Sequence, residues 1–438
     1  MPKTISFRQG LSSVLFWSII SAAFIGPGTV TTASNAGADF ELSLLWALTF
    51  STIATIVLQE AAARITIASG KSLGEIIALK YSERNQQLRL WLFLAVAFGC
   101  AAYQMGNILG AVSGLLFIFT EIPRWLLTLA VAAVGLGFLW MGNVQIIAKT
   151  LGGMVALMGL AFCWVAFQTD FKVFEIAKAA FIPSFPENSS LLIIGLIGTT
   201  IVPYNLFLAS GIGQGQDIRE MRIGLTIAIL IGGIISAAIL FTGTLVGGGY
   251  SYEALVNAMA TKLGSWAVIL FGFGLFAAGM TSCVTAPLAA AITGRTLLGN
   301  QGKKWESTGI NFRLVWGIVF IIGLFFSLIG IRPIPAIILA QAINGVLLPI
   351  VTIFLLLAMN DKQLLPKNFL NKPFSNIFSL IIVGVTCFLG LTNIWKAIGN
   401  VISTINEWQA NLIWLNLFFS GLIVVLLGIK IFDKEKTS

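Results

Sequence analysis

The sequence predicts an all-α, multi-pass membrane protein, a single transmembrane domain over residues 1–438 with about twelve membrane-spanning helices. Hydrophobic residues make up 57% of the chain and charged residues 10%, with a mean hydropathy of +0.94. Soluble domains carry about 25% charged residues. Apolar windows long enough to cross a bilayer follow one another at about 12–38, 42–67, 90–119, 123–142, 146–168, 189–212, 223–249, 264–292, 311–330, 334–358, 376–398 and 410–432.

The distribution of basic residues predicts the orientation. With the N-terminus in the cytoplasm, 20 of the 26 Lys and Arg residues fall on that side, and twelve crossings return the C-terminus to it. This is the asymmetry of the positive-inside rule. We therefore expect a bacterial inner-membrane protein with both termini in the cytoplasm and the lipid bilayer as its main partner. The net charge of +9 is then a topology signal, and nucleic-acid binding is not expected.

The composition also argues against an enzyme. The chain has no histidine, and its four cysteines are scattered without CxxC spacing, so a histidine-containing metal site and a histidine proton relay are excluded. An intramembrane enzyme would need paired acids or a Ser/His arrangement at midplane depth. We expect no catalytic residue and no resident cofactor.

Two short interruptions break the apolar segments one and six, at Gly26 to Thr29 and at Val202 to Asn205. A broken helix exposes backbone N–H and C=O groups that hydrocarbon cannot satisfy, so such breaks persist where they line a cavity or lie inside protein. Breaks at corresponding places in two halves of a chain point to the binding site of a secondary transporter. The alternative is that Pro27 and Pro203 kink two ordinary helices.

The placement of the breaks predicts an inverted repeat. The two prolines lie 176 residues apart, and the five crossings between them turn the second half upside down relative to the first. We expect repeat one at about 11–168, repeat two at about 189–358, and two extra helices at about 376–432 that have no readable role.

At the breaks the chain resembles the NRAMP family of divalent-metal transporters, over roughly residues 10–360. The first helix reads GPGTVTTASNAGADF where the family has DPGN and a similar small-residue run. The sixth reads TTIVPYNLFLAS where the family has MPHN followed by LHS. Ser69 to Glu75, Ala278 to Ser282 and Ala340 to Pro349 match family segments in the second, eighth and tenth helices. The resemblance implies a LeuT-type 5+5 inverted repeat with discontinuous helices one and six.

The chain departs from the family at the residues that carry its chemistry. The metal-binding Asp and Asn of DPGN and Met of MPHN fall on Gly26, Thr29 and Val202, and the MPHN histidine falls on Tyr204. The family's third-helix acids, which carry protons, fall on Gln104 and Asn107. Of the coordinating group, only Gln341 is intact. A dication without a carboxylate at the midplane would cost several kcal/mol.

The predicted substrate site is built from hydroxyl and amide groups at and beside the breaks. Ordinary helix packing, in which Ser and Thr are enriched, is the alternative explanation for the hydroxyls. The predicted substrate-binding residues are Gly26, Thr29, Thr32, Val202, Tyr204, Asn205, Gln341 and Asn344, with Gln104 and Asn107 as polar positions of the third helix.

These residues predict a secondary active transporter of a small ion, and a small inorganic anion such as bicarbonate, or a polar solute, is the favoured substrate. The alternative is a divalent cation of the Mg²⁺/Mn²⁺ class held by neutral oxygen ligands. An ion channel is a third possibility, but no filter motif or ring of charge is visible. The sequence leaves the oligomeric state open and is compatible with a monomer.

Sodium is the candidate coupling ion, which would make the protein a symporter. The hypothetical sodium site combines backbone near Gly28 with hydroxyls of the eighth helix, Thr281, Ser282 and Thr285. On the second helix, Glu60 and Arg64 are one turn apart, and we expect a structural i,i+4 ion pair; an inner gate is the alternative.

Overall fold

The computed structural model describes residues 25–80, 86–141, 144–212, 217–299, 302–399 and 409–436, and within them all regular structure is helical. The first half contains α2 (Pro27–Phe40), α3 (Leu45–Ser69), α4 (Leu73–Lys80), α5 (Gln86–Leu116), α6 (Arg124–Met141) and α7 (Val144–Phe167). The second half contains α8 (Val173–Phe181), α9 (Ser190–Thr200), α10 (Pro203–Ile212), α11 (Ile218–Thr244), α12 (Tyr252–Leu263), α13 (Ala267–Leu298), η2 (Lys303–Trp305), α14 (Ile310–Leu328) and α15 (Pro333–Met359). The chain continues with η3 (Lys367–Phe369), α16 (Pro373–Gly399) and α17 (Gln409–Lys436).

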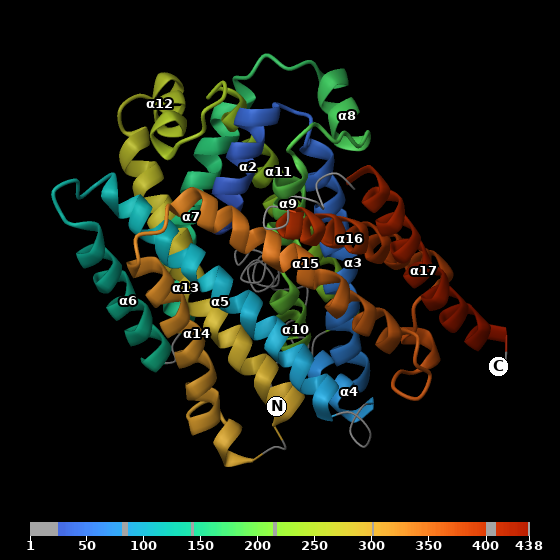
Figure 1. Cartoon of the computed structure of the whole chain (residues 1–438). Coiled ribbons are helices and arrows are strands. Elements are labelled where there is room, and N and C mark those ends of the chain that lie inside the picture. Colours follow the sequence, from blue (N-terminus) through green and yellow to red (C-terminus); the bar gives the residue numbers. More distant parts are fainter. Residues whose placement is uncertain are drawn as a thin grey trace.

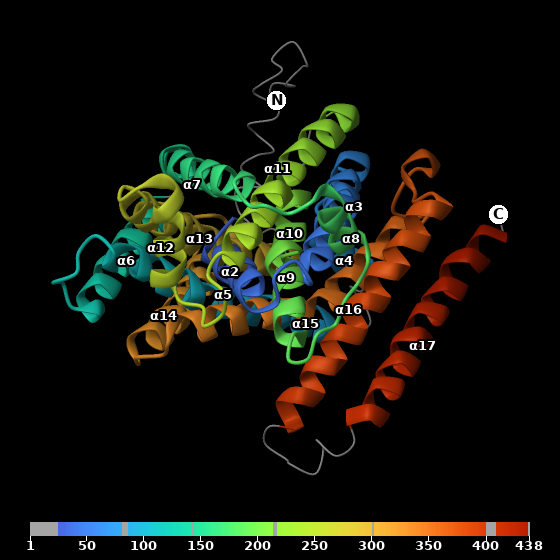
Figure 2. The ribbon, with the colours of Figure 1, turned by 90° about the horizontal axis from the view of Figure 1, so that it is seen from above.

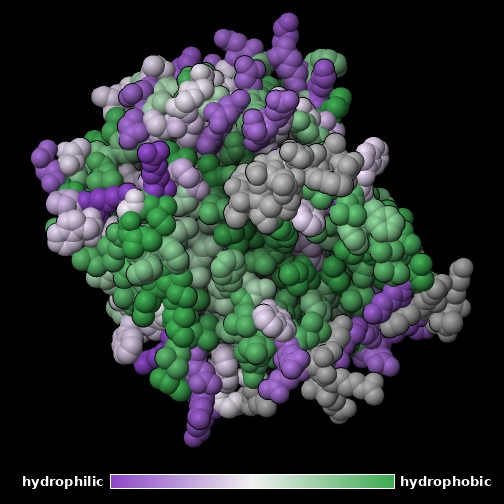
Figure 3. Space-filling view, in the orientation of Figure 1, coloured by the Kyte–Doolittle hydropathy of each residue, from purple (hydrophilic) through white to green (hydrophobic). Residues whose placement is uncertain are grey.

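The helices match the predicted spans. Ten helical segments of the described residues are long and apolar enough to cross a membrane, and α7 coincides with a further window at about 146–168. The first window is described only from its middle, as α2; its earlier residues lie outside the described part of the chain. A broad hydrophobic belt crosses the face seen in Figure 3, with hydrophilic residues gathered above and below it.

The belt separates two polar ends of the molecule. The short helices α8 and α12 lie at one end and α4 lies at the other (Figure 1); we call these the α8 side and the α4 side. The broken helices lie inside the bundle, while α17 lies outermost beside α16 (Figure 2).

The bounds of α11 correct one predicted span. The carboxylate of Asp217 caps its first turn by accepting from the backbone N–H groups of Arg219 (2.8 Å) and Glu220 (3.0 Å). The helix ends at Thr244, so the window predicted at about 223–249 was wrong at both ends. Gly247, Gly248 and Gly249 follow with positive φ angles of 72°, 91° and 65°, a non-helical conformation that glycine adopts readily because it has no Cβ.

Small residues let α2 pack closely on α11. A Cβ at Gly37 would overlap the carbonyl oxygen of Leu240, and one at Gly243 would overlap that of Ser34. This is the close packing that small residues allow between membrane helices. Because α2 also contacts α9, α5 and α15, the first break is fixed in the middle of the bundle.

Candidate functional site

The two helix breaks face each other inside the bundle. Gly26 is extended (φ −102°, ψ −177°) and is followed directly by Pro27, the first residue of α2. Proline is favoured there because the first helical N–H has no partner within the helix. The sixth helix is interrupted where α9 ends at Thr200 and α10 begins at Pro203. The discontinuity predicted at Val202 is therefore present.

A small cavity of about 10 Å³ lies between the breaks, with room for about one water-sized sphere. It is formed by both broken helices together with α5 and α13. Its lining residues are Gly26, Gly28, Tyr103, Asn107, Thr199, Val202, Tyr204 and Ser282.

The predicted residues at the breaks lie in or next to this cavity. Gly26, Val202 and Tyr204 line it. Thr29 follows Gly28, which lines the cavity. The Thr29 hydroxyl is 2.9 Å from the hydroxyl of Thr199. Asn205 is fully buried, and neither atom of its side-chain amide has a hydrogen-bond partner among the described residues. A buried amide in that state is costly unless a water, ion or substrate satisfies it.

Gln341 of α15 sits where the two broken helices approach α15. A Cβ at Gly28 would overlap the Gln341 amide, and one at Gly198 would overlap its backbone carbonyl oxygen. The Nε2 and Oε1 atoms of Gln341 are buried and have no hydrogen-bond partner among the described residues. The same holds for the Thr32 hydroxyl. These groups lie behind the lining residues rather than on the cavity surface.

Asn344 has a different position from the one predicted. Its Nδ2 donates to the carbonyl oxygens of Gly99 and Ala340, both at 3.1 Å, and it does not line the cavity. The side chain connects α15 to α5. Its polarity is therefore used in helix packing, because a buried amide in a membrane helix needs a partner.

The third helix contributes one of its two predicted polar residues to the cavity. Asn107 lines it, and the Asn107 Nδ2 has no partner among the described residues. Gln104 lies one turn away and packs against Gly323 of α14. It is fully buried and does not line the cavity.

The eighth helix, α13, contributes one of three predicted hydroxyls. Ser282 lines the cavity, and a Cβ at Gly26 would lie 3.1 Å from its Oγ. The Thr281 hydroxyl donates to the Ala277 and Ala278 carbonyls (3.1 and 3.0 Å), and the Thr285 hydroxyl donates to the Ser282 carbonyl (3.4 Å). Neither threonine lines the cavity.

Tyr103 of α5 is a lining residue that the sequence did not reveal. Its hydroxyl donates to the Gly198 carbonyl (2.6 Å), and its ring packs edge-on against Tyr204 at a centroid distance of 5.7 Å. The available signal was the hydroxyl itself, because a tyrosine inside an apolar helix needs a partner.

The cavity is electrically neutral. No lining residue is acidic or basic, and the described residues contain no group of three or more His, Cys, Asp or Glu side chains that could hold a metal. The site offers amide, hydroxyl and carbonyl groups alone. It can bind a small ion or polar solute, but it has no group that exchanges protons near neutral pH.

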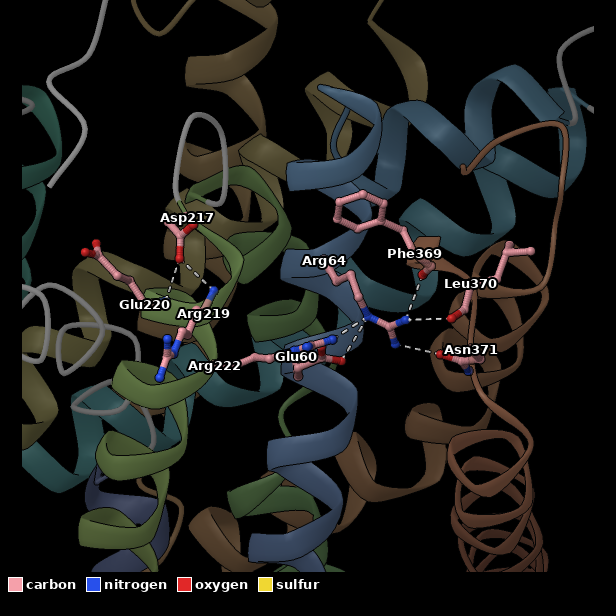
Figure 4. A network of polar contacts seen from close by, with 9 residues as sticks. All are labelled: Glu60, Arg64, Asp217, Arg219, Glu220, Arg222, Phe369, Leu370 and Asn371. Atoms are coloured by element: carbon pink, nitrogen blue, oxygen red, sulfur yellow. Dashed lines mark hydrogen bonds and ion pairs between the residues drawn. The ribbon is translucent and has the colours of Figure 1, made fainter. Parts of the chain in front are cut away.

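A charged network is built around Glu60 and Arg64, in the half of α3 that leads to α4 (Figure 4). The predicted ion pair between Glu60 and Arg64 is confirmed at 3.1 Å, and Arg222 of α11 contacts the same carboxylate at 2.8 Å. The Arg64 guanidinium also donates to the carbonyls of Phe369 (2.7 Å) and Leu370 (3.2 Å) and to Asn371 Oδ1 (2.7 Å). The network joins α3 and α11 to the α15–α16 connection.

Comparison with known sequences identifies related proteins. A sequence model described as "Natural resistance-associated macrophage protein-like" matches residues 18–396. A divalent metal cation transporter MntH of Caldanaerobacter subterraneus subsp. tengcongensis is 25% identical over 390 residues, 85% of this chain and 90% of the relative. The metal transporter Nramp2 of Populus trichocarpa is 27% identical over 314 residues, 66% of this chain and 58% of the relative.

Solved structures show the same fold. The manganese transporter of Eremococcus coleocola superposes with a TM-score of 0.74 at 16% identity, over 98% of this chain and 97% of the other. Mhp1, a nucleobase-cation-symport-1 family transporter, superposes with a TM-score of 0.51 at 14% identity, over 96% of this chain and 92% of the other. The family match covers most of the sequence, and the broken helices lie as this fold requires. The chain belongs to the Nramp family of multi-pass membrane transporters and has the LeuT-type fold.

Proposed function

We propose that this Nramp-family transporter carries a divalent metal cation, held at the helix breaks by neutral oxygen ligands. The related proteins named as divalent metal cation transporters support a metal substrate. The observation that carries the proposal is the cavity, where residues of both broken helices, α5 and α13 surround a space of about one water molecule.

The size of the cavity favours a cation over the anion predicted from the sequence. A metal ion that has lost most of its water is no larger than the space available. The cavity has room for about one water-sized sphere, whereas bicarbonate has four non-hydrogen atoms. In this conformation the neutral cavity therefore suits a small cation.

The ligand chemistry favours hard cations. The cavity has no thioether, since Val202 occupies the position of the family's methionine, and its oxygen ligands come from groups such as Asn107 and Ser282. Oxygen-only sites suit Mg²⁺ and Mn²⁺ over softer metals. Without a carboxylate we expect weak affinity, because neutral ligands offset little of the cost of removing water from a cation such as Mg²⁺, which dehydrates reluctantly.

Flux measurements on the purified protein in liposomes test this proposal. We expect saturable uptake of Mg²⁺ or Mn²⁺ that an Asn107→Leu variant loses, and no uptake of bicarbonate. Bicarbonate uptake without any metal flux or metal binding would overturn it.

A gain-of-function variant tests the ligand assignment. Gly26→Asp and Val202→Met place the family's ligands at the breaks. The extended backbone of Gly26 (φ −102°) accepts any residue, and Asp is a favoured N-cap. We expect tighter Mn²⁺ binding in calorimetry. An unchanged Mn²⁺ affinity in the double variant would contradict a metal site at the breaks.

One observation supports the alternative substrate, a small inorganic anion. Both α2 and α10 begin at the cavity, with Pro27 and Pro203 as their first residues, so two positive helix ends point toward it. The same liposomes decide between the two substrates.

Sodium coupling and orientation are further parts of the proposal. Ser282 is the one predicted sodium ligand of α13 that lines the cavity. Equal uptake in sodium and choline buffers would reject coupling to sodium. The basic residues support cytoplasmic termini, which labelling of a Ser438→Cys variant in intact cells tests.

A further inference from the structure

An arginine joins the ends of α6 and α14 at the edge of the bundle. The Arg313 guanidinium lies 4.4 Å from the ring centroid of Trp140. Helix α6 ends one residue after Trp140, and α14 begins three residues before Arg313. The two helices pack side by side (Figure 1, Figure 2), and less than half of each span is buried. Because both spans end at this contact, we place it at the level of the lipid headgroups, where tryptophan is enriched.

Three further basic side chains surround the start of α14. Lys303 and Lys304 belong to η2, and a Cβ at Gly309, the residue before α14, would overlap the Lys304 carbonyl oxygen. The chain therefore folds back so that the two lysines lie against the helix start. The Arg295 guanidinium of α13 lies 5.6 Å from the ring centroid of Phe312. We call these four cations the basic corner: Arg295, Lys303, Lys304 and Arg313.

The charge of the basic corner is not neutralised within the described part of the chain. None of its four side chains has an ion pair or a hydrogen bond to another described residue. Arg295 and both lysines are exposed. Glu306 is the one acidic residue of the connection from Gly299 to Gly309, and it is exposed and has no ion pair with a described residue. Four cations and one acid leave a net charge of +3 at neutral pH.

An open surface lies one helical turn deeper in the membrane. Gly317 follows Arg313 by one turn on α14, and Gly137 precedes Trp140 by one turn on α6. Residues one turn apart share a helix face, so both glycines lie on the membrane side of the contact between Arg313 and Trp140. A Cβ at either glycine would meet no atom within 4 Å. The apolar side chains near the contact are more than half exposed: Met141, Ile310 and Leu314.

We propose that the basic corner binds an anionic phospholipid, with the phosphate at Arg313 and the two lysines and the acyl chains along the surface at Gly137 and Gly317. A guanidinium stacked on an indole is held in place and keeps N–H donors for phosphate oxygens. Basic residues at the membrane surface attract anionic lipids. A soluble acidic partner fits less well, because the cations lie beside exposed apolar surface that belongs to two membrane spans.

Native mass spectrometry of the purified full chain tests the site, with phosphatidylglycerol and the zwitterionic phosphatidylcholine added in equal amounts. The test variant combines Lys303→Gln, Lys304→Gln and Arg313→Gln. The matched control makes the same change of charge at three exposed lysines beside or within α8 and α12, with Lys172→Gln, Lys178→Gln and Lys262→Gln. We expect the wild type and the control to retain phosphatidylglycerol preferentially, and the test variant to lose about tenfold or more of that preference.

Three outcomes of this comparison would overturn the proposal. The first is equal retention of the two lipids by the wild type, and the second is an unchanged preference in the test variant. The third is an equal loss in the control, because binding would then follow the total charge of the protein. Thermal unfolding of the test variant should match that of the wild type, since its lysines are exposed.

A further pair of variants tests the position of the acyl chains. Gly317→Leu fills the surface below Arg313 without a change of charge and should lower the retention of phosphatidylglycerol. Gly421→Leu on α17 is its control, because a Cβ there also meets no atom within 4 Å, and it should retain the lipid as the wild type does. Unchanged retention in Gly317→Leu would overturn the placement of the chains between α6 and α14. None of these measurements requires transport of a metal.

Discussion

The hydroxyls of Thr29 and Thr199 lie 2.9 Å apart although the residues are separated by 170 positions in the sequence. This contact joins the first helix to the sixth directly beside the cavity between the breaks. Both side chains are buried, so the pair fixes the distance between the two broken helices. Any substrate bound at the breaks depends on that distance.

Replacing either hydroxyl should therefore loosen the site. We expect Thr29→Val and Thr199→Val each to lower the free energy of unfolding by about 1 kcal/mol, because each removes the hydrogen bond between the two buried hydroxyls. The double variant should cost less than the sum of the two. Thermal unfolding in detergent measures all three, and additivity within about 0.5 kcal/mol would show that the two hydroxyls do not interact.

Helices α9 and α15 pack so closely at Gly198 that no side chain larger than hydrogen fits there. A Cβ at Gly198 would overlap the Gln341 carbonyl oxygen and crowd the backbone of Gly345. We expect Gly198→Ala to destabilise the protein by about 1–3 kcal/mol, as overpacking does, and to abolish transport. Gly211→Ala is the control, because a Cβ there meets no atom within 4 Å. Equal melting temperatures for the two variants would contradict the close approach.

The network on the α4 side should depend on Arg64 far more than on Arg222. The Arg64 side chain is 7% exposed and that of Arg222 is 52% exposed. Removing Arg64 takes away one of the two arginine partners of Glu60 and the donor to the Phe369 and Leu370 carbonyls, at a cost of about 2–3 kcal/mol. Removing the exposed Arg222 should cost within about 1 kcal/mol.

Limited trypsin digestion gives a second readout for this network. Arg64→Ala should release the α15–α16 connection, which carries Lys362, Lys367 and Lys372, and so speed its cleavage. Arg222→Ala should leave the cleavage rate near that of the wild type. Protection of this connection in Arg64→Ala would show that other contacts hold it in place.

Transport should change little between about pH 5.5 and 8. The chain has no histidine, and no acidic side chain lines the cavity, so no lining group has an ordinary pKa in that interval. Uptake at a series of pH values, with no proton gradient across the liposomes, measures this. A steep dependence on pH, or metal-driven acidification inside the liposomes, would place a proton carrier elsewhere in the protein.

Several features of the site could be predicted because they depend on local chemistry. Proline removes a helical N–H, and its pairing with flanking glycine or polar residues at matched places predicted both breaks, at Pro27 and Pro203. Pro287 and Pro349, which lack this pattern, lie inside continuous helices. The i,i+4 pair of Glu60 and Arg64 follows from the helical period. The fifth and tenth predicted spans also follow from hydropathy alone.

Other features depended on which helix lies opposite. Asn344 and Gln341 are one turn apart on α15, and both were predicted to bind substrate. Asn344 instead meets the Gly99 carbonyl of α5, whereas Gln341 meets the broken helices. Tyr103 enters the cavity because α5 crosses beside α9. These contacts between helices could not be predicted from the sequence alone.

The sequence by itself determined the membrane-spanning architecture, the positions of the helix breaks and the absence of charged residues at them. These follow from hydropathy, from the missing N–H of proline and from the residue types present. Only the tertiary structure decided the size of the cavity, which of the polar residues line it and the contact of Arg313 with Trp140 at the ends of α14 and α6. Those properties arise from helices that are distant in sequence, and close packing between them is set by side-chain shape across the interface.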